Sequence, residues 1–356
     1  MPSTTSAEGV VITERQTTLN DVASRAGVSP ATVSRVLNGN YPVATSTRDR
    51  VLEAVRHYDY VLNVHARALI HAQSGILGVI LADVSDPFFS EVARGVQSVT
   101  AQTDLLAVIC NTGSDPDQEL KYLNLLRTHR ADAVILVGAG SEHPRIQGEL
   151  VRHAEGLARQ GSLLVFCGRP LPGGTTAAGA VDVDNHGATE LAMVHLARLG
   201  HRRILYLAGP PANTTTTARL AGALGAAKKR RIARRDVTVR AGDLSRRSGQ
   251  ELVEEALSEG LDFTAVLASN DLMAIGALVA LRRAGIGVPD QVSVVGIDDI
   301  PIAADVTPAL TTVRLPMEEM GAAAAKLAVQ ERMPGSRSAP PVQLIERESA
   351  APARTD

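Results

Sequence analysis

Two rhythms of apolar and polar positions divide this chain of 356 residues. Between residues 17 and 58, apolar residues recur at the three- and four-residue spacing of amphipathic helices. From residue 75 onward, short runs of consecutive apolar residues alternate with longer amphipathic stretches. Residues 1–16 are rich in Ser and Thr and follow neither rhythm, so they are expected to form a disordered tail. The pattern therefore predicts a small all-helical module followed by a larger α/β part.

The first predicted helix carries signals at both ends. Thr18 with Asp21 three residues later is the signature of a capping box, and Gly27 is suited to the left-handed conformation that ends a helix. The apolar face between these signals consists of Leu19, Val22, Ala23 and Ala26.

Two more short helices are expected. Ser29 caps the second, and Pro30 takes its first position, where a missing N–H does no harm. This helix ends at Asn38 and Gly39. The third runs from about Thr45, and its inward side chains are expected to be Val51, Val55 and Tyr58.

The apolar runs of the second part are typical of parallel strands that are covered on both faces. They occupy residues 76–81, 105–110, 133–137, 163–167, 180–183, 204–208, 237–239, 265–268 and 292–297. Alternation with helical stretches indicates a doubly wound α/β fold, and this many strands favours two subdomains. Residues 172–179 and 311–314 are the expected crossovers between them, and the helix at 316–331 is expected to return to the first subdomain.

Residues 18–38 have the arrangement of a helix-turn-helix, with the second helix available for a DNA major groove. Arg35 is positioned to donate to the O6 and N7 atoms of a guanine. The hydroxyls and the helix N-terminus suit phosphates. The side chains expected to be exposed on the second helix are Ser29, Pro30, Ala31, Thr32, Ser34, Arg35 and Asn38.

Charge and composition narrow the class of protein. The net charge of −2 excludes a wholly basic nucleic-acid coat protein but not a small basic module. No apolar run reaches the roughly 18 residues of a membrane helix, and the polar first residues lack the features of a secretory signal. We therefore expect a cytoplasmic protein without membrane association, in which Cys110 and Cys167 are free, buried thiols.

At this point the chain resembles the lac-repressor/purine-repressor (LacI/GalR) family of bacterial transcriptional regulators. The resemblance begins with residues 18–38 and the helix containing Thr47 and Arg48. It continues, in order and with matching spacing, through Asp86-Pro87-Phe88-Phe89, residues 131–135, Gly200-His201-Arg202-Arg203-Ile204, residues 219–222, Ser269-Asn270-Asp271, residues 295–299 and residues 310–313. It implies a homodimeric repressor that binds a palindromic operator in double-stranded DNA, with a core similar to sugar-binding periplasmic proteins.

The resemblance also implies a hinge helix at residues 63–70 that enters the minor groove. Leu69 stands where the family inserts a leucine wedge between central base pairs, with Asn63 and Ala66 beside it. Thr18, Leu19 and Thr47 are expected to complete the DNA contacts; Ala44 replaces a usual capping serine, and Thr45 or Thr47 is the expected substitute.

The expected domains follow from these assignments. The tail covers residues 1–16, the headpiece 17–62, the hinge 63–74 and the effector-binding core 75–349. Within the core, the first subdomain comprises about 75–181 and 314–335, and the second comprises about 182–313 and 336–349.

Polar and aromatic residues that follow the predicted strands indicate an effector site between the subdomains. Carboxylate, guanidinium and amide groups bind adjacent hydroxyls, and a phenyl ring covers the apolar face of a sugar. The expected ligand is therefore a small sugar or sugar derivative. The candidate residues, which also match the family's sugar-binding positions, are Asp86, Phe88, Phe89, Arg169, Arg219, Asn270 and Asp298.

Three positions depart from the family pattern. Gly168 replaces a usual acidic residue, Leu244 an aromatic residue and Leu315 a glutamine. These losses leave a ribose-like effector and a larger or more apolar one equally open.

Two other classes of protein share part of this pattern. A secreted sugar-binding protein would share the core but would have no use for residues 18–38. An α/β enzyme is disfavoured because the sequence shows no Gly-rich phosphate loop, no Gly-x-Ser-x-Gly elbow and no Cys/His cluster with metal spacing. No cofactor, metal or catalytic residue is expected. The basic run at residues 228–231, with Arg234 and Arg235, is interpreted as a solvated helix end.

Overall fold

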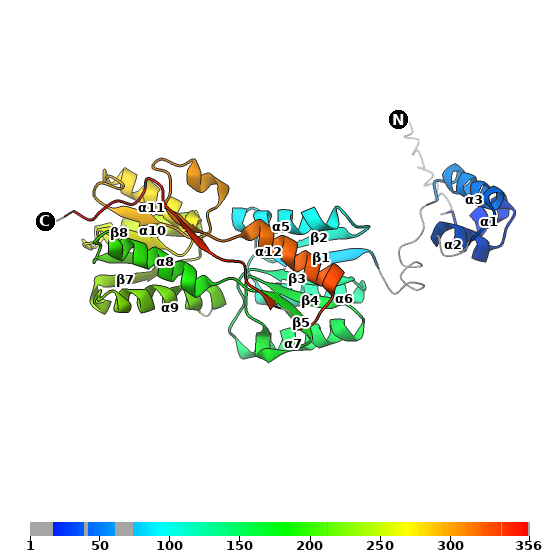
Figure 1. The fold of residues 1–356 in the computed structure, drawn as a ribbon, viewed down its shortest axis with the longest axis horizontal. Coiled ribbons are helices and arrows are strands. Elements are labelled where there is room, and N and C mark those ends of the chain that lie inside the picture. Colours follow the sequence, from blue (N-terminus) through cyan, green and yellow to red (C-terminus); the bar gives the residue numbers. More distant parts are fainter. Residues whose placement is uncertain (1–16, 39–41, 61–73, 212, 336, 355–356) are drawn as a thin grey trace, which may run out of the picture. The chain divides into compact units, whose positions relative to one another are not determined.

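The computed structural model describes residues 17–38, 42–60, 74–211, 213–335 and 337–354. Contacts divide the chain into two units, Met1–Ala72 and Gln73–Asp356. Figure 1 shows the first unit as an all-helical headpiece and the second unit as an α/β core. No helix among the described residues is both long and apolar enough to cross a membrane.

The headpiece consists of α1 (Leu19–Ala26), α2 (Pro30–Asn38) and α3 (Thr45–His57). The capping box of Thr18 and Asp21 is confirmed, and Gly27 ends α1 with φ of 66°. Alternate turns of the helices bury a small apolar cluster made of Val22, Ala23, Ala26, Val33, Val51 and Ala54.

The inward position predicted for Tyr58 is wrong. Its side chain is exposed, and Tyr60 packs against the headpiece cluster instead. α3 ends at His57, and the backbone turns at Asp59, which has φ of 46°. Tyr58 therefore lies outside the helix and does not continue its buried face.

The first sheet of the core has the strand order β11-β5-β4-β3-β1-β2. Alternate residues of β1 enter different apolar clusters: Val79 belongs to one and Ile80 to the other, on opposite faces of the sheet. Burial on both faces explains the continuous apolar runs. The strands are β1 (Ile76–Leu81), β2 (Leu106–Asn111), β3 (Ala133–Val137), β4 (Leu163–Cys167), β5 (Ala178–Val181) and β11 (Arg337–Ser338). The helices are α5 (Pro87–Thr100), α6 (Pro116–Thr128), α7 (Pro144–Arg159) and α12 (Met317–Lys326).

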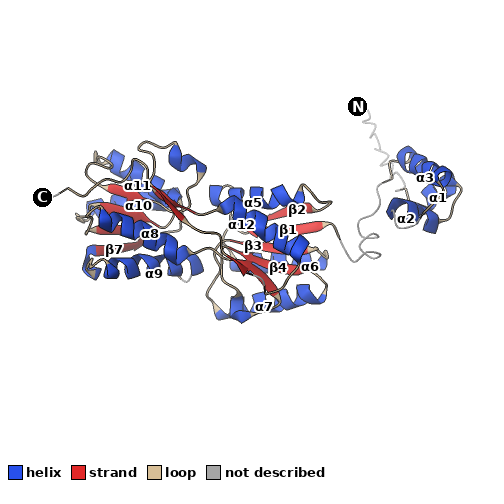
Figure 2. Ribbon diagram, viewed as in Figure 1, coloured by secondary structure: helices blue, strands red, loops and turns tan. Residues whose placement is uncertain are grey.

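The second sheet has the order β7-β6-β8-β9 and is also parallel. Figure 2 shows helices on both sides of its strands. The strands are β6 (Ile204–Ala208), β7 (Val237–Ala241), β8 (Ala265–Ala268) and β9 (Ser293–Val295). The helices are α8 (Asn185–Arg198), α9 (Thr214–Lys229), α10 (Arg246–Ser258) and α11 (Asp271–Arg283). The doubly wound, two-subdomain fold predicted for the core is confirmed.

The chain crosses between the subdomains after β5, at β10 (Thr312–Arg314) and before β12 (Gln343–Ile345). β10 and β12 pair antiparallel, so two of the crossing segments form a ribbon. The crossover predicted at residues 172–179 is wrong, because this stretch leads into β5, which still pairs with β4 in the first sheet. Similarly, β11 pairs with β5, which assigns Arg337–Ser338 to the first sheet rather than to the second subdomain.

β2 does not follow the expectation of two covered faces. It is the edge strand of the first sheet, and it leaves Leu106 64% and Ile109 48% exposed. An apolar run alone does not distinguish an edge strand from a central one.

Helices α5 and α12 approach each other more closely than side chains would permit. A Cβ on Gly95 would lie 2.0 Å from the carbonyl oxygen of Glu318, and a Cβ on Gly321 would lie 2.0 Å from that of Val92. The two glycines therefore allow backbone-to-backbone packing of a helix from each end of the first subdomain's sequence.

Candidate functional site

The second headpiece helix presents polar groups at its N-terminus. Ser29 Oγ accepts from the backbone N–H of Thr32 at 3.2 Å and lies 2.9 Å from Thr32 Oγ1. Ser29, Pro30, Ala31 and Arg35 are exposed, whereas Thr32 and Ser34 are half-buried. This surface supplies hydroxyls, N–H groups at the helix N-terminus and one guanidinium, which are the groups used for phosphates and base edges.

Two other residues predicted to contact DNA take part in hydrogen bonding or packing within the headpiece. Thr18 Oγ1 lies 2.6 Å from Asp21 Oδ2 in the capping box, and Leu19 packs against the headpiece cluster. Thr47 is half-buried at the start of α3, where Ala44 makes no side-chain cap bond. The side chain of Asn38 and the hinge residues Asn63, Ala66 and Leu69 lie outside the described residues.

In the core, Arg219 and Asp298 form a buried ion pair. Arg219 Nη2 donates to Asp298 Oδ1 at 3.1 Å, and the two side chains are 6% and 7% exposed. Arg219 Nε donates to Asn185 Oδ1 at 2.8 Å, and Nη1 donates to the carbonyl oxygen of Ser269. Three segments, α8, the loop after β8 and the loop after β9, thus hold one guanidinium. Sequence reasoning missed Asn185, because its position as the first residue of α8 is an ordinary one for a helix start.

The backbone at Asp298 is constrained by the second crossover. Asp298 has φ of 123°, which side-chain-bearing residues rarely adopt. Its N–H donates to the carbonyl of Val313 at 2.9 Å, and its own carbonyl accepts from the N–H of Leu315 at 3.1 Å. The crossover strand therefore fixes where this carboxyl group points.

Electrostatics connect this pair to the first subdomain. Burial raises the pKa of Asp298 to about 7; Arg219 opposes this shift, and the carboxylate of Asp86 adds to it. Burial also raises the pKa of Asp86, and Arg219 lowers it. Asp86 belongs to the loop before α5, so groups from both subdomains share one electrostatic environment.

Asp86 and the two phenylalanines stand at the start of α5. Asp86 Oδ1 caps the helix by accepting from the N–H of Phe88 at 2.9 Å. The rings of Phe88 and Phe89 meet edge to face, with centroids 5.2 Å apart. Both are partly buried, and Phe89 lies against Gly138, where a Cβ would come within 2.6 Å of its ring.

Arg169 is engaged by a carboxylate that sequence reasoning missed. Its Nη2 donates to Glu119 Oε2 at 2.8 Å, and the two side chains are 2% and 14% exposed. Its Nη1 donates to the carbonyl of Ala139 at 3.2 Å, while the buried Nε has no hydrogen-bond partner among the described residues. Glu119 lies in the first turn of α6, where an acidic residue is common for helix stability, so nothing in the sequence pattern indicated this pairing.

The two subdomains touch beside Arg169. The N–H of Gly140 donates to Thr214 Oγ1 at 3.0 Å, and the N–H of Thr214 donates to the carbonyl of Gly140 at 3.1 Å. A Cβ on Gly140 would come within 3.3 Å of the Arg169 side chain. This clasp joins the loop after β3 to the start of α9, the helix that carries Arg219.

Both ends of the Asn270 amide are already used. Oδ1 caps α11 by accepting from the N–H of Met273 at 3.0 Å, and Nδ2 donates to the carbonyl of Leu244 at 2.9 Å. The neighbouring Asp271 is fully buried and accepts from Thr312 Oγ1 and the N–H of Ile300. Asn270 is thus near the site but serves as a cap in this state.

The three positions that depart from the family pattern have structural explanations. Gly168 has φ of 79°, and a Cβ there would lie 3.3 Å from Met320. Leu244 has φ of 70° and packs at Gly209, and Leu315 is buried. The backbone conformation at Gly168 and the packing of Leu244 and Leu315 thus account for these three residues locally.

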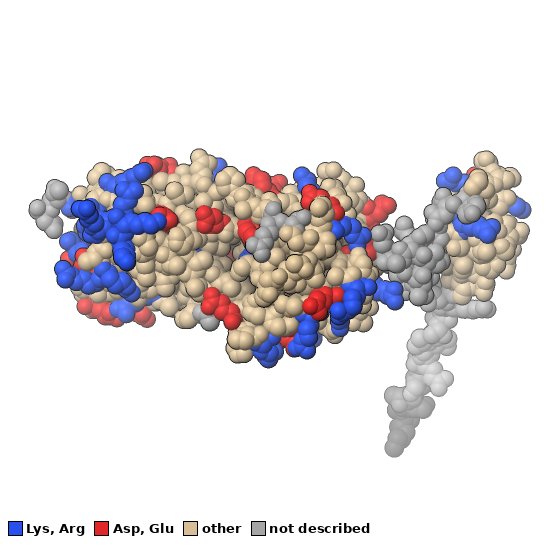
Figure 3. Space-filling view, turned by 60° about the horizontal axis from the view of Figure 1, so that its bottom comes forward, with Lys and Arg blue, Asp and Glu red and all other residues tan. Residues whose placement is uncertain are grey.

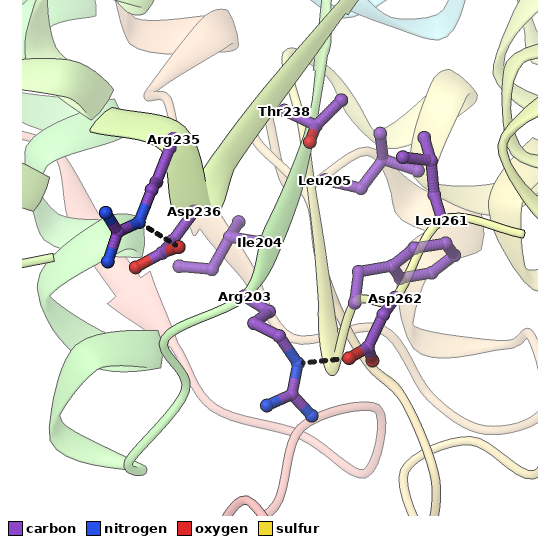
Figure 4. Close-up of a pocket in the computed structure, with 9 residues that line it drawn as sticks. Arg203, Ile204, Leu205, Arg235, Asp236, Thr238, Leu261 and Asp262 are labelled. Atoms are coloured by element: carbon purple, nitrogen blue, oxygen red, sulfur yellow. Dashed lines mark ion pairs between the residues drawn. The ribbon is translucent and has the colours of Figure 1, made fainter. Parts of the chain in front are cut away.

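A small pocket of about 90 Å³ lies elsewhere, at the amino ends of β6 and β7 (Figure 4). Two ion pairs line it: Arg203 Nε lies 2.9 Å from Asp262 Oδ2, and Arg235 Nε lies 3.7 Å from Asp236 Oδ1. It includes none of the predicted effector residues, which follow the carboxyl ends of the strands.

Comparison with known proteins identifies both parts. Residues 18–63 match the model of the lacI family of bacterial regulatory proteins, and residues 193–350 match that of the periplasmic binding protein-like domain. The HTH-type transcriptional regulator GalS of Salmonella typhimurium is 37% identical over 313 residues, covering 88% of this chain and 89% of that protein.

Solved structures agree with this assignment. The lac repressor dimer bound to operator and the anti-inducer ONPF has a TM-score of 0.80 and 27% identity, covering 95% of this chain and all of that one. The transcriptional regulator CelR in complex with cellobiose has a TM-score of 0.69 and 30% identity, covering 94% of this chain and all of that one. The protein therefore belongs to the lacI family of bacterial transcriptional regulators.

Proposed function

We propose that this protein is a cytoplasmic, homodimeric repressor that binds a palindromic operator and releases it when a small sugar or sugar derivative binds between its core subdomains. In this proposal residues 17–62 read the DNA, residues 63–74 form the hinge, and the α/β core from residue 75 onward binds effector and partner. Induction is preferred to corepression because a sugar-like site suits the control of catabolic genes.

The buried pair of Arg219 and Asp298 is the observation that carries the effector assignment. Burying two charges is unfavourable unless they are paired and hydrogen-bonded, so a buried pair of this kind is weak evidence for a purely stabilising role. Together with Asp86 it offers two carboxylates and a guanidinium to adjacent hydroxyls. The complex of CelR with cellobiose supports a sugar as the ligand class.

The exposed face of α2 supports operator binding. Arg35→Ala is expected to weaken operator binding by about 1–3 kcal/mol and to relax preference at one base pair in each half-site. Competition with operators substituted at single positions measures this preference. A uniform loss across all sequences would show that Arg35 contacts phosphate instead of a base.

Apolar side chains on the edge of the first sheet support a dimer. Leu106 and Ile109 of β2 are exposed, and so is Val84 in the loop after β1. Exposed apolar groups that gather at one edge are typical of an interface. The solved lac repressor, which matches 95% of this chain, is a dimer.

Calorimetry with a panel of sugars and sugar derivatives, with and without operator DNA, tests the effector proposal. Because coupling between two ligands is reciprocal, operator must lower effector affinity by the same factor by which effector lowers operator affinity, about 5–150-fold. Asp298→Ala and the milder Asp298→Asn are expected to abolish the response and keep operator affinity.

Two outcomes would change the proposal. An effector that tightens operator binding would make the protein a corepressor-dependent regulator. A full response in Asp298→Asn would place the effector away from the Arg219–Asp298 pair. Arg35→Ala serves as the control, because it should lose operator affinity and bind effector normally.

A further inference from the structure

Basic side chains gather at the end of the core where α9 ends, drawn on the left in Figure 3. We call the following residues the basic end: Arg203, Lys228, Lys229, Arg230, Arg231, Arg234 and Arg235. They lie at the amino edge of the second sheet, whereas Arg219 and Asp298 follow its carboxyl edge. The basic end is therefore separate from the proposed effector site.

Stabilisation by the helix dipole explains only some of the basic residues at this end. Basic residues in the last turn of a helix are stabilised by its negative end, and Lys228 and Lys229 lie there. The effect fades within about one turn, yet Arg230 and Arg231 follow the helix, and Arg234 and Arg235 lie in the next 3-10 helix.

Arg231 also occupies a position that its backbone does not favour. Its φ is 61°, a left-handed conformation that disfavours residues with a Cβ by about 1–2 kcal/mol. The other three helices of this subdomain end with glycine in the same conformation, at Gly200, Gly260 and Gly285. Glycine would be more stable at this backbone conformation, and the chain has an arginine there, as it also has at Arg130 after α6.

The acidic residues nearby do not balance the basic end. Glu190 accepts from Lys229 at 2.7 Å, and the pocket of Figure 4 supplies Asp236 beside Arg235 and Asp262 beside Arg203. Among the described residues, three carboxylates thus form ion pairs with Lys229, Arg235 and Arg203. Lys228, Arg230 and Arg231 are exposed. No carboxylate of the described residues lies within 4.0 Å of them as an ion-pair partner.

From this arrangement we propose that the basic end binds the phosphate backbone of a second DNA duplex, without sequence preference, while the headpieces hold the operator. The cations are spread over a helix end, a turn and a 3-10 helix, which suits an extended polyanion. A small anion would instead need several cations around one point. The adjacent pocket does not offer this, because Asp236 and Asp262 are among its lining residues.

The surface favours DNA over an acidic protein. Protein partners are usually anchored by exposed aromatic side chains. Among the described core residues, the large apolar side chains that are exposed include no aromatic one. A protein that already resides on DNA also meets a high local concentration of duplex, so a modest electrostatic surface is enough for binding.

The test is a two-duplex capture assay with the full chain. Operator DNA on beads is saturated with protein, and a labelled duplex without operator sequence is added at several salt concentrations. The test variant carries Lys228→Gln, Lys229→Gln, Arg230→Gln and Arg231→Gln. The matched control carries Arg246→Gln and Arg247→Gln, two exposed arginines at the other end of the same subdomain.

Wild type and the control should capture the labelled duplex, with affinity falling steeply with salt. The test variant should reduce the slope of log affinity against log salt by about 0.9 for each lost phosphate contact, up to about 3–4 in all. This corresponds to loss of most capture at low salt. Operator binding, measured separately, should be unchanged, so a failed repressor assignment remains distinguishable from a failed second contact.

Equal capture by the test variant and wild type would overturn the proposal, as would no capture by wild type at low salt. Polyglutamate is included as a competitor. If it binds the basic end more tightly than an equal charge of duplex, the surface is a protein-docking site and the DNA proposal is wrong.

Discussion

Asp298 combines a strained backbone with a buried ion pair. Its backbone has φ of 123° and is hydrogen-bonded to the crossover on both sides, and its carboxyl is buried against Arg219. Such strain persists only where the surrounding structure imposes it, and it is concentrated at functional sites. The pKa of this carboxyl, raised by burial to about 7, means that it is poised between its two protonation states near neutral pH.

Effector affinity is therefore expected to fall as the pH drops below about 7. A sugar hydroxyl that donates to the carboxylate must displace the proton, so each pH unit below the pKa weakens binding by up to about tenfold. The same shift makes the free energy of unfolding of the unliganded core fall as the pH rises from 3.8 towards about 7, because the unfolded chain ionises first. Calorimetry and urea unfolding across this range measure the two effects.

Matched variants separate the contributing groups. Asp298→Asn should bind effector weakly and lose the pH dependence. Asp86→Asn should keep the dependence but shift it to lower pH, because the Asp86 carboxylate helps to raise the pKa of Asp298. An unchanged pH profile in Asp298→Asn would show that another group titrates.

At the scale of elements, the packing of α5 against α12 links the proposed effector site to the crossover. α5 begins beside Asp86, and α12 follows Leu315, whose N–H donates to the carbonyl of Asp298. The close contact at Gly95 and Gly321 leaves no side chain between the two helices. A displacement of the crossover should therefore move α12 and, through their direct backbone contact, α5 as well, since packed interiors deform little.

Gly321→Ala is expected to lower the free energy of unfolding by about 3 kcal/mol, because the added Cβ meets the backbone of Val92 at 2.0 Å. Urea denaturation measures this change. The control is Gly148→Ala on α7, where the structure shows open space; it should gain up to about 1 kcal/mol from helix propensity. Equal effects in the two variants would mean that the helices separate freely.

The hinge segment carries a prediction that the described residues do not test. From its place in the family pattern, Leu69 is expected to kink the operator at its centre by roughly 20–90°. Circular-permutation gel shifts measure the bend. A straight operator with wild-type protein, or the same bend with Leu69→Gly, would rule out the wedge.

At the scale of the whole molecule, the proposed dimer interface lies at the sheet edge formed by β2. A helix-turn-helix reads one half-site, so a palindromic operator requires two chains. Exposed edge strands with apolar side chains are unfavourable in a monomer, and Leu106 and Ile109 are both exposed on this edge. A second chain packed against this edge would cover the exposed apolar side chains and would also supply the headpiece for the second half-site.

Leu106→Glu combined with Ile109→Glu is expected to shift the protein from dimer to monomer and to weaken operator binding. Sedimentation velocity measures the first effect and gel shifts measure the second. Met333→Glu is the matched control, since Met333 is 58% exposed but lies near β11 at the opposite edge of the sheet. A dimer that survives the double substitution would place the interface elsewhere.

The sequence alone determined the elements and their order. Capping signals at Thr18 and Gly27, the spacing of apolar residues in the helices and the apolar runs of the strands all act locally, within a few residues, so they could be read in one dimension. β1, β3, β4, β6 and β8 begin and end where the apolar runs do. The helix-turn-helix was identified for the same reason, since its chemistry lies within one continuous segment.

The tertiary structure decided which residues meet. Glu119 pairs with Arg169, and Asn185 binds Arg219, although 50 and 34 residues separate the members of these pairs. It also decided that β2 is an edge strand and that residues 172–179 stay within the first subdomain. In the same way, it decided that the side-chain oxygen of Asn270 caps α11. These outcomes depend on long-range packing and on the order of strands in a sheet, which local patterns of polarity do not encode.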